Sequence, residues 1–230
     1  MCGRINLRAT PGELKEFFEL FREPVWSKPR FNLGPMQKIL VIRQQPNGER
    51  TAEPLQWGLV PGWAKDASGG SKMTIARSET VATKSAYRSA FRQRRCLIPA
   101  SGFFEWQVLT SKSKQAWHVF RKDGDLLAFA GLWEKWKSPE GWELESCSMM
   151  TTEPNEFMVK FHDRMPVILD RSDWSRWLEP AETDPKNLAE LLQPCPNAWL
   201  DRSAVGPFVN SVKNDSPECI RVVNEERTLF

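Results

Sequence analysis

The stretch from residue 95 to residue 154 constrains the fold most, because strand patterns follow one another there with no helical pattern between them. Four segments are rich in aromatic and aliphatic residues: 95–107, 116–124, 126–136 and 144–154. Three more strands are predicted, at 38–45, at the start of 52–63, where prolines then give a loop, and at 220–225. Strands and helices are intermingled without regular alternation, which favours an α+β fold with a mostly antiparallel, curled sheet.

Helices are predicted around this strand-rich stretch. Residues 10–13, Thr-Pro-Gly-Glu, have the cap, the first-turn proline and the third-position acid of a helix N-terminus. Leu14, Phe17, Phe18 and Phe21 follow at helical spacing, so this helix is expected to bury one face. The other predicted helices are 79–95, 172–179 and 184–193.

No repeat and no long Gly/Ser linker divides the 230 residues. Asn47-Gly48 and Asp123-Gly124 are strong signals for tight turns, and residues 64–72 are expected to form a flexible loop. Residues 1–230 are therefore predicted to form a single domain.

Composition excludes several classes of protein. A net charge of +3 does not by itself indicate a nucleic-acid partner. The longest apolar run, 126–133, is too short to cross a membrane, and the N-terminus has no apolar signal region. Five cysteines without a CxxC spacing favour neither a disulfide framework nor a zinc site. We therefore predict a cytoplasmic protein with no metal and no cofactor.

Cys2 directly follows the initiator methionine. Removal of Met1, which the small Cys2 side chain permits, leaves an α-amine beside the thiol of the same residue. The pKa of an α-amine is about 7.7–8.0, so part of it is neutral and nucleophilic at pH 7. A cysteine near a terminus is also compatible with no function at all, so other residues must decide.

Two further stretches combine reactive groups with apolar flanks. Glu105 stands among Phe103, Phe104 and Trp106, where strand alternation favours an outward-facing carboxylate over a buried acid. His162 lies in "FHDRMPVIL", and the chain has only one other histidine, His118. Any imidazole chemistry must use one of these two residues.

An N-terminal aminothiol, an acid and an imidazole are suited to two chemistries. In the first, the thiol attacks an amide, as in N-terminal-nucleophile amidohydrolases such as glutaminases. In the second, the amine forms an imine with an aldehyde and the thiol closes a thiazolidine ring on the imine carbon. Only an N-terminal cysteine supplies both nucleophiles, and Glu105 and His162 are candidates for the proton transfers. No motif for an oxyanion hole is visible, which disfavours the amidohydrolase.

Seven motifs occur in the order found in the SRAP (SOS response-associated peptidase) family, which the chain therefore resembles. They are "MCGR", "RFNLGP", "WGLVPGWAKD", "ARSETV", "RRCLIPASGFFEW", "HDRMPVIL" and "VNSVKN". The resemblance extends from Cys2 to Asn214 and implies one α+β domain with a barrel-like core and peripheral helices. It also implies a monomer that binds single-stranded DNA and crosslinks covalently to abasic sites, an enzyme-like activity of the peptidase or lyase type. The peptidase name is associated with processing of the protein's own N-terminus.

The same resemblance implies roles for individual residues. Cys2 would be the crosslinking nucleophile, Glu105 the acid or base, and His162 the group that protonates or positions the sugar hydroxyl. The residues expected to contact DNA are Arg4, Arg77 and Arg164 at phosphates, and Asn32, Pro35 and Trp63 along the path of the bases.

One position departs from the family pattern. The family commonly has Asn-Ala-Arg where this chain has Ile75-Ala76-Arg77. That Asn is expected to hydrogen-bond at the abasic sugar, and an isoleucine cannot replace this bond. A third possibility, a non-covalent binder of single strands that uses arginines and tryptophans, would have no use for Cys2.

Overall fold

Residues 3–224 are described by the computed structural model. The strands are β1 (Ile5–Leu7), β2 (Arg30–Leu33), β3 (Lys38–Gln44), β4 (Arg50–Trp57), β5 (Ile75–Arg77), β6 (Arg95–Ala100), β7 (Gly102–Thr110), β8 (Ser113–Arg121), β9 (Leu127–Lys137), β10 (Glu143–Thr152), β11 (Met165–Pro166) and β12 (Leu200–Val205). The α-helices are α1 (Pro11–Phe18), α2 (Arg88–Gln93), α3 (Trp174–Leu178) and α4 (Pro185–Ala189). The 3₁₀ helices are η1 (Ser68–Lys72), η2 (Met158–Lys160), η3 (Arg171–Asp173), η4 (Asn197–Trp199), η5 (Pro207–Asn210) and η6 (Pro217–Ile220).

Five strands close into a barrel. β10 pairs in parallel with β4 and antiparallel with β9, while β4–β3, β3–β6 and β6–β9 are antiparallel pairs. The pairing therefore returns to its starting strand, and β5 and β11 extend it by pairing with β10. The prediction of a mostly antiparallel, barrel-like α+β core is confirmed.

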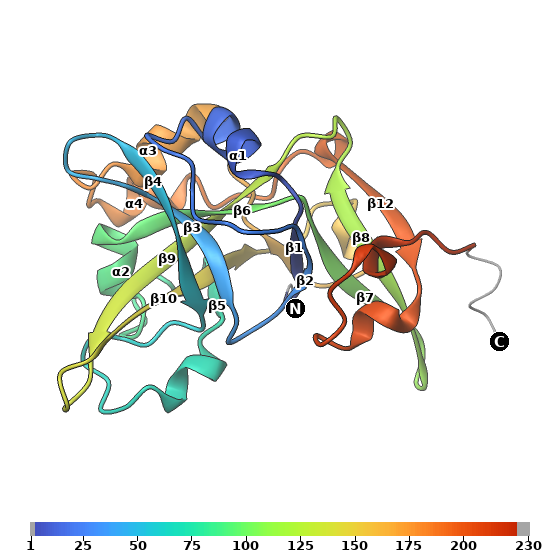
Figure 1. The fold of residues 1–230 in the computed structure, drawn as a ribbon, viewed down its shortest axis with the longest axis horizontal. Helices are drawn as coiled ribbons and strands as arrows, with labels where there is room; N and C mark the ends of the chain where they lie inside the picture. Colours follow the sequence, from blue (N-terminus) through green and yellow to red (C-terminus); the bar gives the residue numbers. More distant parts are fainter. Residues whose placement is uncertain (1–2, 225–230) are drawn as a thin grey trace.

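A second sheet, with strand order β12-β8-β7-β1-β2, lies beside the barrel (Figure 1). The predicted strand at 95–107 is in fact two strands, because the chain leaves the barrel as β6 and enters the second sheet as β7. Ser101 lies at this junction, where its amide donates to the Asn6 carbonyl (2.8 Å) and its hydroxyl accepts from the Arg8 amide (2.9 Å). Phe103 on β7 packs against Phe129 on β9, so this face of β7 is directed toward the barrel.

The first helix begins as predicted but ends early. Thr10 and Glu13 form a reciprocal capping box, and Leu14 and Phe18 are buried. The helix ends at Phe18, its C-cap Glu19 adopts a left-handed conformation (φ 56°), and Leu20 then forms a bridge with Arg50. Phe21 is consequently 62% exposed, and its predicted place on the buried helix face is wrong.

Two other predicted elements are also corrected. The helix expected at 79–95 is formed only over Arg88–Gln93, and turns occupy most of the residues before it. The β-branched Thr80, Val81 and Thr83 lose side-chain freedom in a helix, which explains the shortening. In place of the strand expected at 220–225, the described residues contain η6 and a single bridge between Val205 and Val222, and residue 225 lies outside them.

His118 is a structural histidine in the second sheet. It is buried between Phe104 and Phe120, and its Nε2 lies 2.8 Å from Nδ2 of Asn6, which donates to it. Gly102 leaves room for the ring, since a Cβ there would lie 2.3 Å from Nε2. Burial, with a smaller contribution from the charge of Arg8, lowers the pKa of His118 to about 3. His118 is therefore neutral at pH 7.

The buried neutral imidazole predicts a loss of stability in acid. Between about pH 6.5, the ordinary value, and about pH 3, the folded value, the unfolded chain binds a proton that the folded chain does not. The free energy of unfolding should therefore fall as the pH is lowered through this window, by up to roughly 1.4 kcal/mol per pH unit from this residue. Urea denaturation from pH 7 to pH 4 should show a shallower pH dependence in His118→Gln. Equal pH dependence in the two proteins would contradict this account.

Candidate functional site

The register of β1 against β7 brings the start of the described chain to Glu105. Ile5 is paired with Phe103, and the Phe104 amide donates to the Arg4 carbonyl at 2.9 Å. Gly3, one residue earlier on the antiparallel pair, lies next to Glu105 in this register. Cys2, the predicted nucleophile, lies outside the described residues, and a single peptide unit of about 3.8 Å joins its Cα to that of Gly3.

Glu105 is buried, with 1% of its surface exposed, so the prediction of an outward-facing carboxylate is wrong. Alternation exposes every second residue only where one face of a sheet meets water. Here Phe103 is covered by the barrel, and Phe104 is buried in a second apolar cluster on the other face. Trp117 of β8 lies directly opposite Glu105.

The segment that carries His162 is attached to the same region of β7 and β8. Gln107 donates through Nε2 to the Lys160 carbonyl (2.8 Å) and accepts through Oε1 from the Trp117 indole (3.0 Å). The Phe161 ring packs against Trp117, with 5.4 Å between ring centroids. The predicted acid and the predicted imidazole are thus carried by elements in direct contact.

The His162 ring is oriented by its own loop. Its Nδ1 accepts a hydrogen bond from the Arg164 amide (2.9 Å) and lies 2.8 Å from Oδ1 of Asp163. An Nδ1 that accepts from the Arg164 amide carries no proton, whereas one that donates to Asp163 does, so the two contacts belong to different protonation forms of the ring. The His162 side chain is 21% exposed, which is compatible with contact to a ligand.

Arg164 and Arg77 lie beside the same residue of β10. Arg164 donates to both carboxylate oxygens of Glu79 (2.5 and 3.0 Å) and to the Thr151 carbonyl (2.8 Å). Hydrogen bonding by Arg164 lowers the pKa of Glu79. Thr151 is also paired with Arg77 of β5, whose side chain is exposed. Two of the three predicted phosphate ligands are therefore brought together.

Arg4, the third predicted phosphate ligand, is half-buried in a polar network. It donates to Oδ1 of Asn32 (2.8 Å) and to the carbonyls of Val209 (2.8 Å) and Asn210 (3.3 Å), and lies 5.4 Å from the Trp106 ring. Burial lowers the pKa of its guanidinium. These contacts give Arg4 a structural task besides any contact to a phosphate.

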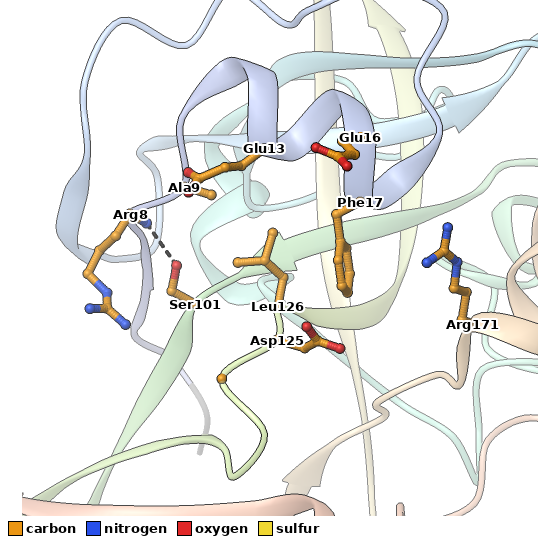
Figure 2. Close-up of a pocket in the computed structure, with 10 residues that line it drawn as sticks. Arg8, Ala9, Glu13, Glu16, Phe17, Ser101, Asp125, Leu126 and Arg171 are labelled. Carbon is orange, nitrogen blue, oxygen red and sulfur yellow. Dashed lines mark hydrogen bonds between the residues drawn. The ribbon is translucent and has the colours of Figure 1, made fainter.

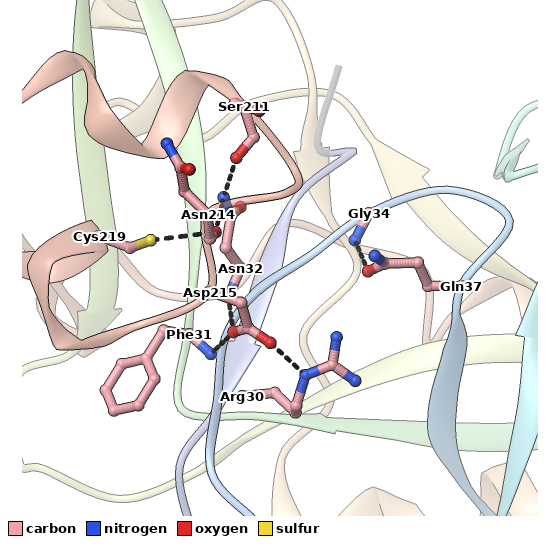
Figure 3. Close-up of polar contacts among 9 residues, drawn as sticks. All are labelled: Arg30, Phe31, Asn32, Gly34, Gln37, Ser211, Asn214, Asp215 and Cys219. Atoms are coloured by element: carbon pink, nitrogen blue, oxygen red, sulfur yellow. Dashed lines mark hydrogen bonds and ion pairs between the residues drawn. The ribbon is translucent and has the colours of Figure 1, made fainter.

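Asn32 holds the segment that follows β12 (Figure 3). Its side chain is fully buried and donates to the carbonyls of Val209, Ser211 and Asn214 at 2.8–3.1 Å. Asp215 completes the network by accepting from the amides of Phe31 and Asn32 and by an ion pair with Arg30. Asn32 was expected along the path of the bases, but the structure buries its amide as a support for that region.

Pro35 and Trp63 are exposed, the latter by 67%. The turn after Pro35 is fixed by Met36, which has a left-handed φ of 67° and donates to the Trp57 carbonyl (2.7 Å). The loop that carries Trp63 is fixed by Trp136, whose indole donates to the Ala64 carbonyl (2.6 Å). Both residues are presented to solvent on anchored loops.

Ile75 begins β5, opposite Met149 of β10. Its side chain is partly buried and packs against the main core, while its carbonyl accepts from the Tyr87 hydroxyl (3.1 Å). The backbone of this position is thus held independently of the identity of its side chain.

A cavity of about 570 Å³ is lined by none of these candidates. It lies between α1, Ser101 and the 124–126 turn, with Arg8 and Arg171 on opposite sides (Figure 2). Carboxylates of Glu13, Glu16 and Asp125 mix with these cations, so its charge favours no one class of ligand. In residues 3–224, no group of three His, Cys, Asp or Glu residues is placed to bind a metal, and no helix has the length and hydropathy to span a membrane.

Residues 1–212 match the family described as SOS response associated peptidase (SRAP). The chain belongs to the SRAP family. It is 43% identical to the "Abasic site processing protein YoqW" of Bacillus subtilis (strain 168), over 96% of this chain and 99% of that protein. It is 31% identical to the "Abasic site processing protein HMCES" of Gallus gallus, over 86% of this chain and 69% of that protein. A crystal structure of a Bacteroides thetaiotaomicron protein matches this SRAP fold with a TM-score of 0.87 at 22% identity, covering 97% of this chain and all of the other.

Several residues that hold the candidate site residues in place carry no signal in the sequence. Glu79 was noted only within a family motif, and Gln107 and Asp215 were not noted as site residues. Gln107 contacts Lys160, 53 residues away in the chain, and Asp215 contacts Asn32, 183 residues away. No local pattern in the sequence signals such contacts.

Proposed function

We propose that this SRAP protein forms a covalent crosslink through Cys2 to the ring-opened aldehyde of abasic sites in single-stranded DNA. The observation that carries the proposal is the β1–β7 register, which places Gly3, the neighbour of Cys2, beside the buried Glu105. The relatives named abasic site processing proteins support the class of lesion. Residues 1–230 act as one domain, and the predictions of a monomer and of a cytoplasmic location stand as predictions from the sequence.

The proposed chemistry joins both nucleophiles of Cys2 to one carbon. After Met1 is removed, the self-processing step associated with the family, the α-amine adds to the aldehyde carbon and water leaves to give an imine. The thiolate then adds to the imine carbon, and the nitrogen takes up a proton as the five-membered ring closes. The net reaction releases one water. Glu105 exchanges protons with the amine and the departing oxygen, and His162 acts at the sugar hydroxyl.

The DNA strand is proposed to pass between phosphate ligands and base-stacking residues. Arg77 and Arg164, which meet at Thr151, bind the phosphates beside the lesion. Pro35 and Trp63 contact bases from their anchored loops. Arg4 and Asn32 stabilise this surface indirectly, because their side chains form hydrogen bonds with each other and with backbone carbonyls of the 209–215 segment.

The test is a crosslinking assay with an abasic single-stranded oligonucleotide, read as a heat-stable band on a denaturing gel. Wild type is expected to form the band, Cys2→Ala to form none, and Cys2→Ser to form at most a weaker, reversible adduct. Cys96, Cys147, Cys195 and Cys219 are buried and lack an adjacent free amine. An undiminished band in Cys2→Ala would overturn the proposal, and glutamine hydrolysis without any band would favour the amidohydrolase.

Glu105→Gln should separate proton transfer from DNA binding. The substitution keeps the shape and hydrogen bonding of the side chain but removes its proton exchange, which is typically worth roughly 10²–10⁴-fold in rate. Single-turnover crosslinking should slow by this order while the Kd for an intact oligonucleotide stays unchanged. Glu134→Gln is the matched control, because Glu134 is also largely buried but lies on β9 in an ion pair with Arg94. Equal rates in wild type and Glu105→Gln would contradict the role of Glu105.

Ile75→Asn should accelerate crosslinking. An asparagine there supplies a hydrogen bond to the sugar that isoleucine lacks, worth up to roughly tenfold in rate. The backbone hydrogen bond from Tyr87 does not depend on the side chain, so the fold should tolerate the change. Single-turnover rates of both proteins on the same oligonucleotide decide the point. A slower Ile75→Asn would show that Ile75 is an adaptation to a different aldehyde or lesion.

A further inference from the structure

Arg202 occupies an aromatic cage next to the proposed site. Its guanidinium carbon lies 4.7 Å from the centroid of Trp117, 4.5 Å from that of Phe161 and 5.7 Å from that of Phe157. Arg202 is on β12, where it pairs with Val119 of β8. Among the described residues, its buried Nε has no hydrogen-bond partner. Contact with the ring faces is therefore a main interaction of this cation.

The three rings come from the two parts of the site that must be held together. Trp117 is on β8, directly opposite Glu105 of β7. Phe157 and Phe161 belong to the segment that leads to His162, and their rings pack against each other with 5.7 Å between centroids. A single guanidinium thus joins the strands that carry the acid to the loop that carries the imidazole.

Two side-chain hydrogen bonds connect the same parts of the chain as this cage. The Trp117 indole donates to Gln107, and Gln107 donates to the Lys160 carbonyl, two residues before His162. The His162 amide itself donates to the Met158 carbonyl (3.0 Å). The loop is therefore tied to β7 and β8 by polar bonds at its backbone, while the cage fixes its ring side chains.

We propose that Arg202 is a positioning residue for the reaction: through its stacking on Trp117, Phe157 and Phe161, it sets the placement of His162 relative to Glu105. The inference rests on the proposed function for its effect on rate. The planar guanidinium suits this task better than an ammonium, because it stacks on ring faces and is more weakly hydrated. Arg202 touches neither DNA nor the reacting atoms in this account.

The test compares Arg202→Met, Arg202→Lys and Arg121→Met. Arg202→Met keeps the aliphatic stem but removes the charge and the planar group, and single-turnover crosslinking should slow about tenfold. Arg202→Lys keeps the charge and should lose only about threefold. Arg121→Met is the matched control, because Arg121 also stacks on a tryptophan, Trp199 at 4.8 Å, and pairs with Asp123 away from the site. Its rate should stay within twofold of wild type. Affinity for an intact oligonucleotide should be unchanged in all three variants.

A second readout does not depend on crosslinking. The ¹H–¹⁵N signals of the His162 imidazole should move or broaden in Arg202→Met and stay in place in Arg121→Met. A wild-type rate together with unmoved His162 signals in Arg202→Met would overturn the positioning role. Absence of crosslinking by wild type would instead overturn the proposed function, and the imidazole signals would then decide the positioning role alone. Should Arg202→Met fail to fold, Phe157→Leu removes one wall of the cage and should slow crosslinking about threefold with the same displacement of the His162 signals.

Discussion

The passage of the chain from the barrel to the second sheet at Ser101 is the constraint on which the rest of the site depends. Ser101 is held there by Asn6 and by the backbone of Arg8, so β1 is fixed along β7 immediately beyond the junction. A shift of one residue in this register would turn every β7 side chain to the opposite face. The aligned pair brings Gly3 to Glu105, and the packing of Phe103 on Phe129 keeps this face of β7 against the barrel. The position of the described chain start beside β7 is thus a consequence of sheet pairing.

At its β2 edge, the second sheet is stabilised by polar contacts between residues far apart in the chain. The Asp215 carboxylate accepts a hydrogen bond from the Asn32 backbone amide. The Asn32 side chain in turn donates to three backbone carbonyls in the 209–214 segment just before Asp215. Arg4 adds its guanidinium to the same region. Buried polar groups are costly unless paired, so a network of this kind fixes one arrangement of the 209–215 segment. The residues after β12 therefore help to shape the surface beside Arg4 and Asn32.

The sequence predicted correctly those features that depend on interactions between residues a few positions apart. The Thr10–Glu13 capping box and the Asn47-Gly48 turn form as predicted, with Gly48 at a φ of +85°. The mostly antiparallel class also followed from the succession of strand patterns. Alternation could not predict the orientation of Glu105. A polar residue in a strand suggests a face exposed to solvent, and the sequence does not reveal that a neighbouring sheet covers that face. His118 and His162 were equivalent candidates in the sequence, and only the burial of His118 beside Phe104 and Asn6 separates them. The cage around Arg202 joins residues 41 to 85 positions apart, beyond the range of any sequence periodicity.

The central claim is that one residue, Cys2, supplies both the amine and the thiol that bind the lesion. Intact-mass spectrometry of the protein after incubation with an abasic single-stranded oligonucleotide tests this claim most directly. The account predicts one species whose mass equals that of the protein without Met1 plus the oligonucleotide minus one water, stable to borohydride because no imine remains. A chain that retains Met1 should form no such species. A borohydride-independent, stable oligonucleotide adduct on a protein that retains Met1, or on a variant without the Cys2 thiol, would contradict the account.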